Sequence, residues 1–343
     1  MHVETVNPMN YPEWDALLLR NPDYSFFHTS TWARVLSKSY RYKPCYFIIK
    51  RDNGLSSLIP FFEVNSLLTG KRGVSLPFTD FCKPIFSKEE NIDKIMEWII
   101  DYGKQRGWRY FEIRDGYNLL HNEVPSSYYY EHCLALNQDE QLIHSKLKSN
   151  VKRNIKKALN EGVTVEFHSD LEAMRDFYRL NCMTRKNHNL PPQPYKFFKI
   201  IMDEIISKGR GVVVLAHHRE TVIAGAVYFH FGDKVIYKYG ASDRRYQSLR
   251  ANNLIMWEAI KWFSQKGFKN LSFGRTNPEN KGLMQFKNSW GGDVNEIYYF
   301  KYCLKKQLFV RNGNTFTPGK KIFAHMPMSL SKMIGRVSYR HIG

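Results

Sequence analysis

The chain has 343 residues, of which 43% are hydrophobic and 15% aromatic, so it can form two packed domains and is not intrinsically disordered. Its 51 Lys and Arg exceed its 32 Asp and Glu, and the net charge of +19 predicts an anionic partner: nucleic acid, a phosphorylated metabolite or a membrane surface. The sequence has no signal-peptide pattern, no apolar run near the roughly 20 residues that span a bilayer, and no CxxC pair among its five cysteines. These features predict a cytoplasmic protein with reduced thiols, and histidines without HExxH-type spacing predict no metal site.

Two parts of the chain have the same order of predicted elements: a hairpin, a strand, an amphipathic helix that ends at a glycine, and another strand. The hairpin strands are predicted at 45–50 and 55–64, and again at 211–216 and 221–231. The helices and the strands after them are predicted within 97–115 and 258–276. Gly107 and Gly267, 160 residues apart, are the matching helix ends. We interpret this order as a duplicated αβ unit and not as chance similarity.

The repeat predicts an α+β fold with two subdomains, each built on a mixed sheet. The polar stretch 136–145 marks the joint, which places the first subdomain at 1–140 and the second at 141–304. Residues 305–343 form a basic C-terminal tail. We expect this tail to pack back on the first subdomain, because chain termini often lie together.

A basic helix is predicted at 146–162, with an apolar face of Leu147, Val151, Ile155 and Ala158/Leu159. Six basic residues occur between Lys146 and Lys157, and no acidic residue comes before Glu161. One interpretation is a solvated amphipathic helix. The other is a helix that faces phosphate, either of RNA or of a diphosphate.

A second amphipathic pattern lies in the tail, where the sequence from 301 to 343 has nine Lys or Arg and no Asp or Glu. The apolar positions are Leu330, Met333, Ile334 and Val337, and the basic positions are Lys332, Arg336 and Arg340. The apolar face is expected either to pack on the first subdomain or to lie on an anionic membrane.

Five segments resemble the Fem-type (FemAB-like) peptidoglycan aminoacyltransferases and their relatives with the GNAT, or acetyltransferase, fold. They are HTSTWARVL at 28–36, LKSNVKRNIKKALNEGVTV at 147–165, FYRLNCMTRK at 177–186, YGASDRRYQSLRANNLIMWEAIKWFSQKGFKNLSFG at 239–274 and GLMQFKNSWGG at 282–292. The resemblance implies two tandem GNAT-like subdomains. No heptad run is long enough for the coiled-coil arm that some members carry, so an armless form is expected.

The resemblance implies an acyltransferase that moves an acyl group onto an amine of a cell-envelope precursor. The best-known members move an amino acid from aminoacyl-tRNA to a peptidoglycan precursor, and other relatives are N-acyltransferases of exopolysaccharide or lipid-linked sugar pathways. We therefore expect no permanently bound cofactor, and a donor that is aminoacyl-tRNA or acyl-CoA. The basic tail suggests contact with the inner face of the membrane. A non-enzymatic RNA- or membrane-binding protein is the alternative from another class.

The resemblance also assigns candidate site residues. Phe286 and Lys287 match a catalytic pair, and Lys287 would stabilise negative charge on the tetrahedral intermediate or on the leaving ribose oxygen, unless it is a surface lysine beside a turn. Arg185 matches an arginine that meets acceptor phosphates, or else pairs at a helix end. The other expected substrate-binding residues are Trp32, Lys152, Arg153, Lys156, Tyr239, Arg244, Arg245, Arg250 and Arg275. Trp32 is expected to pack in the core or to contact the acceptor.

The loop at 242–253 departs from the acyl-CoA-dependent pattern, because it contains no glycine to bring backbone N–H groups to a pyrophosphate. Arg244, Arg245 and Arg250 can bind phosphate by side chain instead, and the departure favours a tRNA-like donor. Asp243 is expected either to orient the substrate amine or to cap the turn. Gly291 and Gly292 are expected to let the backbone pass close to a ligand, or to form a tight turn. The sequence offers no convincing general base.

Overall fold

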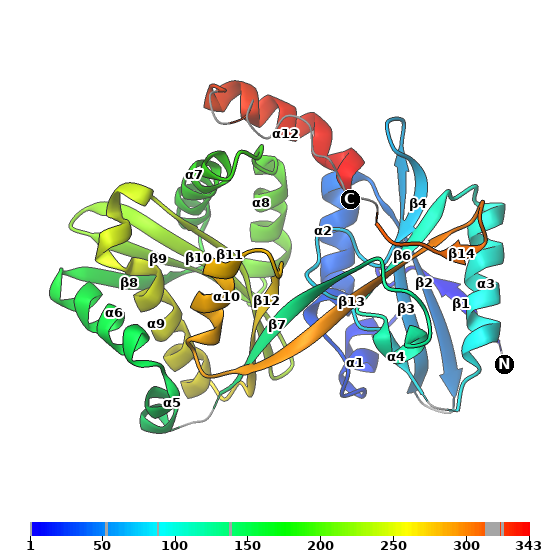
Figure 1. The fold of residues 1–343 in the computed structure, drawn as a ribbon, viewed down its shortest axis with the longest axis horizontal. Coiled ribbons are helices and arrows are strands. Elements are labelled where there is room, and N and C mark those ends of the chain that lie inside the picture. Colours follow the sequence, from blue (N-terminus) through cyan, green and yellow to red (C-terminus); the bar gives the residue numbers. More distant parts are fainter. Residues whose placement is uncertain (1, 52–53, 88, 137–138, 313–322, 324–325) are drawn as a thin grey trace. The chain divides into compact units, whose positions relative to one another are not determined.

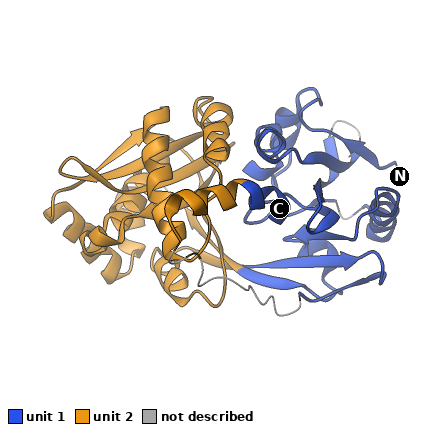
Figure 2. Cartoon of the chain, turned by 90° about the horizontal axis from the view of Figure 1, so that it is seen from above, with its two compact units in different colours: residues 1–129, 296–316, 337–343 blue, residues 130–295, 317–336 orange. Residues whose placement is uncertain are grey.

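The computed structural model describes residues 2–51, 54–87, 89–136, 139–312, 323 and 326–343 (Figure 1). The chain divides into two compact units (Figure 2). Unit 1 comprises Met1–Tyr129, Glu296–Phe316 and Val337–Gly343, and unit 2 comprises Tyr130–Asn295 and Thr317–Arg336. The sequence places the joint at 140/141, whereas the compact units divide at 129/130. The strands β7 (Ser127–Ala135) and β13 (Asp293–Cys303) each begin in one unit and end in the other, so these two crossings fall within strands and not in loops.

Unit 1 is a mixed sheet with helices. Its strand order is β1 (Glu4–Val6), β2 (Lys43–Arg51), β3 (Gly54–Ser66), β4 (Gly70–Val74), β6 (Tyr110–Arg114) and β13, with β5 (Ile85–Phe86) on β3 and β14 (Leu308–Phe309) on β13. The helical segments are α1 (Trp14–Leu19), η1 (Phe26–His28), α2 (Ser30–Tyr40), α3 (Ile92–Gln105) and α4 (Tyr117–Leu120). Apolar residues of β2, β3 and β6 pack with α3 in one core, where Phe61 contacts Phe47 and Phe111 edge to face.

Unit 2 has a mixed sheet with helices on both faces. Its strand order is β7, β12 (Asn270–Thr276), β11 (Lys234–Ser242), β10 (Thr221–Phe231), β9 (Gly211–His218) and β8 (Val163–His168). The helical segments are α5 (Glu140–Lys146), α6 (Ser149–Asn160), α7 (Leu171–Asn187), α8 (Tyr195–Ile201), η2 (Met202–Ile206), η3 (Arg244–Leu249), α9 (Ala251–Gln265) and α10 (Lys281–Asn288).

Alternating residues of β10 determine which helices cover each face of the unit 2 sheet. Tyr228 packs on Phe263 of α9, and the same core includes the apolar residues of α6. Its neighbour Phe229 points the other way, toward Tyr239, whose ring in turn contacts Phe198 of α8. The sheet therefore separates α6 and α9 from α8.

The predicted duplication is present in the structure. Unit 1 has the hairpin β2–β3, then β4, helix α3, and β6 parallel to β4; unit 2 has the hairpin β9–β10, then β11, helix α9, and β12 parallel to β11. Gly107 and Gly267 follow the two helices with φ of 70° and 80°, the left-handed region that glycine enters without strain. The prediction of two tandem αβ subdomains is confirmed. Within the described ranges the longest helix is α7, with 17 residues, and no helix is long and apolar enough to cross a membrane.

The predicted basic helix is shorter than expected. Leu147 separates α5 from α6, so the helix covers Ser149–Asn160 and not 146–162. Val151, Ile155 and Ala158 are buried as predicted, whereas Leu159 is exposed.

The tail forms helix α12 (Met328–Ile342), and the expected packing of its apolar face on the first subdomain is not seen at three of the four predicted positions, while Ile334 is half-buried. Met333 and Val337 are 58% and 60% exposed, and Leu330 is also exposed. Ser331, Gly335 and Tyr339 are buried instead. Small residues allow closer approach than the apolar ones: a Cβ at Gly335 would lie 2.1 Å from the carbonyl oxygen of Pro192.

The last turn of α12 belongs to unit 1. The Tyr42 hydroxyl donates to the carbonyl oxygen of Tyr339 at 3.1 Å, and Arg72 donates to the carbonyl oxygens of His341 and Gly343. The basic residues Lys332, Arg336 and Arg340 stay exposed.

Candidate active site

The carboxyl ends of the parallel strands β11 and β12 separate. The two strands pair over Lys234–Ile236 and Asn270–Ser272, although β11 continues to Ser242 and β12 to Thr276. The register of β12 against β7 also shifts after Ser272, where Gly274 has φ of 67°. Ligands of open αβ sheets bind at the carboxyl ends of strands, so this end of β12 is a candidate site.

Lys287 of α10 fixes this end of β12. Its side chain is only 3% exposed, and Nζ donates to the carbonyl oxygen of Gly274 at 2.8 Å and to that of Arg275 at 3.2 Å. The alternative that Lys287 is a surface lysine beside a turn is therefore wrong. A buried ammonium needs such acceptors, because burying it without them costs several kcal/mol.

The neighbours of Lys287 explain the two glycines that follow it. Phe286 is half-buried and packs edge to face on the buried Trp290, with ring centroids 5.9 Å apart. A Cβ at Gly291 would lie 2.8 Å from the carbonyl oxygen of Lys146, and one at Gly292 would lie 2.4 Å from that of Cys133. The glycines thus let the chain pass close to its own backbone.

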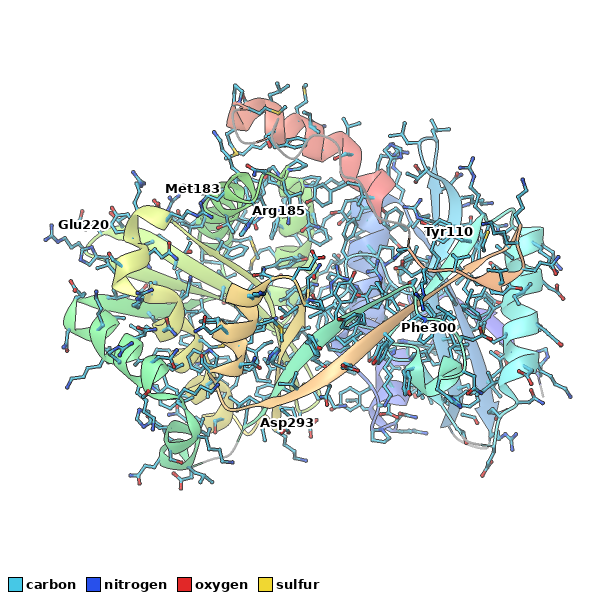
Figure 3. The ribbon with its side chains drawn as sticks, viewed as in Figure 1. Tyr110, Met183, Arg185, Glu220, Asp293 and Phe300 are labelled. Atoms are coloured by element: carbon cyan, nitrogen blue, oxygen red, sulfur yellow. The ribbon has the colours of Figure 1, made fainter. Side chains whose placement is uncertain are left out.

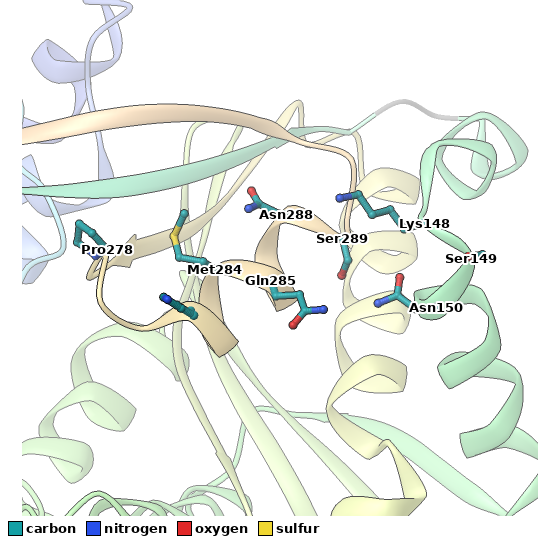
Figure 4. A pocket seen from close by; sticks show the side chains of 9 residues that line it. Lys148, Ser149, Asn150, Pro278, Met284, Gln285, Asn288 and Ser289 are labelled. Atoms are coloured by element: carbon teal, nitrogen blue, oxygen red, sulfur yellow. The ribbon is translucent and has the colours of Figure 1, made fainter.

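A cavity of about 820 Å³ opens between the start of α6 and α10 (Figure 4). We call it the α6–α10 cavity. Its lining residues are Lys148, Ser149, Asn150, Pro278, Lys281, Met284, Gln285, Asn288 and Ser289. The lining is mixed polar and apolar, and its two lysines, with no acidic residue among the lining residues, make it positively charged. Its volume is typical of a site for a small molecule or part of a larger one.

Backbone groups of α6 add to the positive charge of the cavity. Lys148 is the N-cap residue and has no side-chain cap, so the first turn of the 12-residue helix is open to an anion. The backbone N–H of Lys148 donates to the carbonyl oxygen of Ser289 at 3.1 Å, which holds the start of α6 against the end of α10.

His132 is a buried residue beside this cavity that the sequence did not indicate. Its Nε2 lies 2.8 Å from Oδ1 of Asn288, a lining residue, and its Nδ1 is shielded without a hydrogen-bond partner. Burial, and to a lesser degree the charge of Lys287, lower the pKa of His132, so the ring is neutral at pH 7. His132 lies beside the cavity because β7 pairs with β12. The spacing of residues in the sequence does not indicate this pairing.

The predicted phosphate-binding residues of α6 do not line the cavity. The Nζ of Lys152 donates to the carbonyl oxygen of Ser145 at 3.1 Å, while Arg153 and Lys156 are exposed farther along the helix. The structure brings the residues of the first helical turn to the cavity instead.

The glycine-free loop forms the short helix η3 ahead of α9. Asp243 is buried and accepts from the backbone N–H of Arg245 at 3.0 Å, and their side chains pair at 2.6 Å. The side-chain hydrogen bond from Arg245 outweighs the effect of burial and lowers the pKa of Asp243. Asp243 therefore caps the turn, the second of its two predicted roles. Arg250 has φ of 61°, so an arginine occupies a left-handed position that glycine usually takes.

Positive charge gathers where α7 ends near η3. Burial, and to a lesser degree the charges of Arg244 and Arg185, lower the pKa of His188. Arg185, on α7 (Figure 3), donates through Nε to the carbonyl oxygen of Pro191 at 3.3 Å. Tyr239 is half-buried against Phe198, with centroids 5.4 Å apart.

Trp32 and Arg275 both make contacts within the fold. Trp32 is fully buried in unit 1, where it packs edge to face on Phe27. The prediction that Trp32 contacts the acceptor is therefore wrong, because none of its surface is accessible. Arg275 is half-buried on β12 and accepts from Lys287 through its backbone carbonyl oxygen.

The comparisons with known proteins agree with this architecture. Residues 145–288, which include Lys287 and every residue that lines the α6–α10 cavity except Ser289, match the family described as an acetyltransferase (GNAT) domain. A lipid II:glycine glycyltransferase of Staphylococcus haemolyticus (strain JCSC1435) is 35% identical over 104 residues, which cover 28% of this chain and 25% of that protein. The chain thus spans about a quarter of the length of the curated relatives that it matches.

Two solved structures share the fold across most of the chain. FemX has a TM-score of 0.66 at 13% identity and covers 87% of this chain and 97% of its own. A tandem GNAT protein from the clavulanic acid biosynthesis pathway has a TM-score of 0.57 at 7% identity, with coverage of 88% and 99%. Residues 145–288 are thus similar to a GNAT domain and the chain has a tandem GNAT fold, so the predicted resemblance to Fem-type proteins is confirmed.

Proposed function

We propose that this protein is a Fem-type acyltransferase that moves an aminoacyl group from aminoacyl-tRNA onto an amine of a peptidoglycan precursor. The observation that carries the proposal is the positively charged α6–α10 cavity inside the GNAT domain. The similarity to lipid II:glycine glycyltransferases supports a cell-envelope acceptor and makes glycine the first amino acid to test.

In the proposed reaction the acceptor amine attacks the ester carbonyl of the aminoacyl-tRNA. The C–N bond forms, the carbonyl oxygen becomes an oxyanion, and the ester C–O bond then breaks to release the ribose hydroxyl. The proton of the amine passes to the leaving oxygen, directly or through water, so no dedicated base is required. Lys287 supplies a buried positive charge that stabilises the developing negative charge, and it also positions the end of β12 through the Gly274 and Arg275 carbonyls.

The α6–α10 cavity would bind the phosphates of one of the two anionic substrates. Lys148 and Lys281 provide point charges, and the open first turn of α6 provides backbone N–H groups. Arg185 and Arg244 form a second positive region that would contact the other substrate.

Acyl-CoA is the alternative donor, and the match to the acetyltransferase family favours it. The loop before α9 argues against it. Arg245 is paired with Asp243, and Arg250 places a side chain where a glycine would let backbone N–H groups approach a pyrophosphate. A non-enzymatic RNA-binding role is the second alternative, and it is separated from both by a transfer assay.

If the acceptor is linked to a membrane lipid, the exposed face of α12 would bind the inner face of the membrane. Leu330, Met333 and Val337 lie exposed beside Lys332, Arg336 and Arg340, a combination that binds anionic lipid surfaces. A lipid-linked precursor is presented at such a surface, so binding there would concentrate the enzyme on its acceptor.

The transfer reaction is tested with purified protein, lipid II, and either tRNA charged with radiolabelled amino acids or radiolabelled acetyl-CoA. We expect label to move from glycyl-tRNA to lipid II. The Lys148→Met/Lys281→Met double variant should raise KM strongly, while the control Lys305→Met, an exposed lysine outside the cavity, should not. Transfer from acetyl-CoA but not from aminoacyl-tRNA would establish the alternative donor. If the protein binds tRNA but transfers label from neither donor, the proposal that it is an enzyme is refuted.

The membrane role is tested by vesicle flotation. Wild type should float with phosphatidylglycerol vesicles at low salt and not with neutral phosphatidylcholine vesicles. Met333→Glu/Val337→Glu should remain in solution, while Leu159→Glu, which changes an exposed leucine on α6, should behave as wild type. Equal flotation of all three proteins would refute the assignment to α12.

A further inference from the structure

Three potential metal ligands meet on one face of the sheet edge in unit 2. Glu166 and His168 lie two residues apart on β8 and therefore point to the same side of the strand. His217 of β9 pairs with Thr164, which has the same orientation as Glu166 and His168. The ligand atoms of this β8–β9 cluster (Glu166, His168 and His217) lie within 4.8 Å of one another.

The spacing of these atoms is close to that around a tetrahedral metal ion. Oε2 of Glu166 lies 3.4 Å from Nε2 of His168 and 3.8 Å from Nε2 of His217. Ligand atoms about 2.0–2.1 Å from a tetrahedral Zn²⁺ are separated by about 3.3 Å. A small rotation of the exposed Glu166 side chain and of the rings is enough to close the difference.

Two imidazole nitrogens of the cluster are without a hydrogen bond. Nε2 of His168 and Nε2 of His217 are shielded from solvent, and neither has a hydrogen-bond partner. A shielded polar atom without a hydrogen bond is unfavourable, and a bound ion is one explanation for it. Two such atoms that face one carboxylate oxygen form a set of nitrogen and oxygen donors that zinc prefers.

A further carboxylate supports one of the two rings. Nδ1 of His168 lies 3.5 Å from Oδ2 of Asp170, and a carboxylate behind a histidine ligand orients the ring and strengthens its other nitrogen as a donor. The other oxygen of Asp170, Oδ1, caps α7 by accepting from the backbone N–H groups of Glu172 and Ala173. The cluster is thus connected to the start of the helix that carries Arg185.

From this geometry we propose that Glu166, His168 and His217 bind one Zn²⁺, with water as the fourth ligand and Asp170 as the outer partner of His168. The ion has a structural role: it fastens β8, at the edge of the sheet, to β9 and to the N-terminus of α7. The site does not share a residue with the α6–α10 cavity, and the inference is independent of the proposed function.

The test uses the full chain, purified without a polyhistidine tag, stripped with chelator and dialysed against Zn²⁺. We expect one Zn²⁺ per chain, and Co²⁺ in its place should give the visible absorption of a tetrahedral site. His168→Gln and His217→Gln should each weaken Zn²⁺ binding at least about tenfold, and Asp170→Asn, which keeps the helix cap, should weaken it about tenfold. Zn²⁺ should also raise the melting temperature of the wild type.

The matched control is His218→Gln, because His218 is adjacent to His217 and points to the opposite face of β9. It should bind Zn²⁺ as the wild type does. Glu166→Gln alters an exposed side chain and keeps the test valid if a histidine variant fails to fold. The proposal would be overturned if the wild type bound less than one equivalent of Zn²⁺ per chain, or if Glu166→Gln bound Zn²⁺ as tightly as the wild type.

Discussion

Replacing Lys287 with methionine tests the candidate site most directly. The substitution keeps the length of the side chain and removes the ammonium that donates to the Gly274 and Arg275 carbonyls at 2.8 and 3.2 Å. A hydrogen bond from a charged group contributes about 1.5–3 kcal/mol, so the two together contribute about 3–6 kcal/mol. Removing a buried charge recovers part of its desolvation cost, and we expect a net loss of about 3 kcal/mol in the free energy of unfolding.

The loss is measured by urea unfolding, followed by the fluorescence of the tryptophans, which include the buried Trp290 next to this helix. Lys281→Met, on the same helix and exposed, is the control and should change stability by less than about 0.5 kcal/mol. A loss below about 1 kcal/mol for Lys287→Met would show that the two bonds do not anchor β12.

The same variant separates anchoring from catalysis. At a temperature where Lys287→Met remains folded, its kcat in the transfer assay should still fall by about 10²–10³, as expected when a charge that stabilises the transition state is lost. A folded variant with wild-type kcat would refute the catalytic role and leave Lys287 as a structural residue.

Three further predictions concern stability. Glu63→Ala should cost about 2–3 kcal/mol, because Glu63 is buried and accepts two bonds from the exposed Arg106 at 2.9 Å and one from the buried Trp108 at 3.0 Å; urea unfolding measures the loss, and a value below about 1 kcal/mol contradicts the prediction. Gly292→Ala should destabilise by at least about 2 kcal/mol, whereas Gly282→Ala, with open space around its Cβ position in α10, should stabilise by about 0.5–1 kcal/mol; the same sign for both would refute the argument from close approach. Burial, with the charges of Arg210 and Lys266, lowers the pKa of His230 to about 4, so folding favours the neutral ring, and stability present above pH 6.5 should be lost as the pH falls from 6.5 to 4. This loss, about 2 kcal/mol for a partly solvated ring, should be absent in His230→Gln, and equal pH profiles of the two proteins would refute it.

The repeat could be predicted because its signals are local. The helix-ending Gly107 and Gly267 act through neighbouring residues and a positive φ, and the sequence reports both features directly. The unit boundaries follow no such signal, because β7 and β13 carry regular strand pairing from one unit into the other.

The orientation of α12 could not be predicted from its amphipathic pattern. Helical spacing identifies an apolar face but does not say what covers it. Here close approach decides the outcome, since Gly335 allows contact with the Pro192 carbonyl and the larger apolar residues are left exposed. The β8–β9 cluster was missed for a related reason: strand register, and not sequence spacing, brings His217 to Glu166 and His168.

The stretch from β12 to the double glycine explains how α10 can be both fixed and part of a binding site. The C-terminal half of the helix is held by Lys287 on β12, by Asn288 on His132 and by the contact of Ser289 with Lys148. The N-terminal half begins at the Asn280 cap, and the exposed Lys281 on its first turn lines the cavity. Lys281 therefore lies at the end of α10 opposite to these anchors, away from the carbonyls that Lys287 holds. In the proposed reaction, this separation would keep the end of β12 in place while Lys281 contacts an anionic substrate.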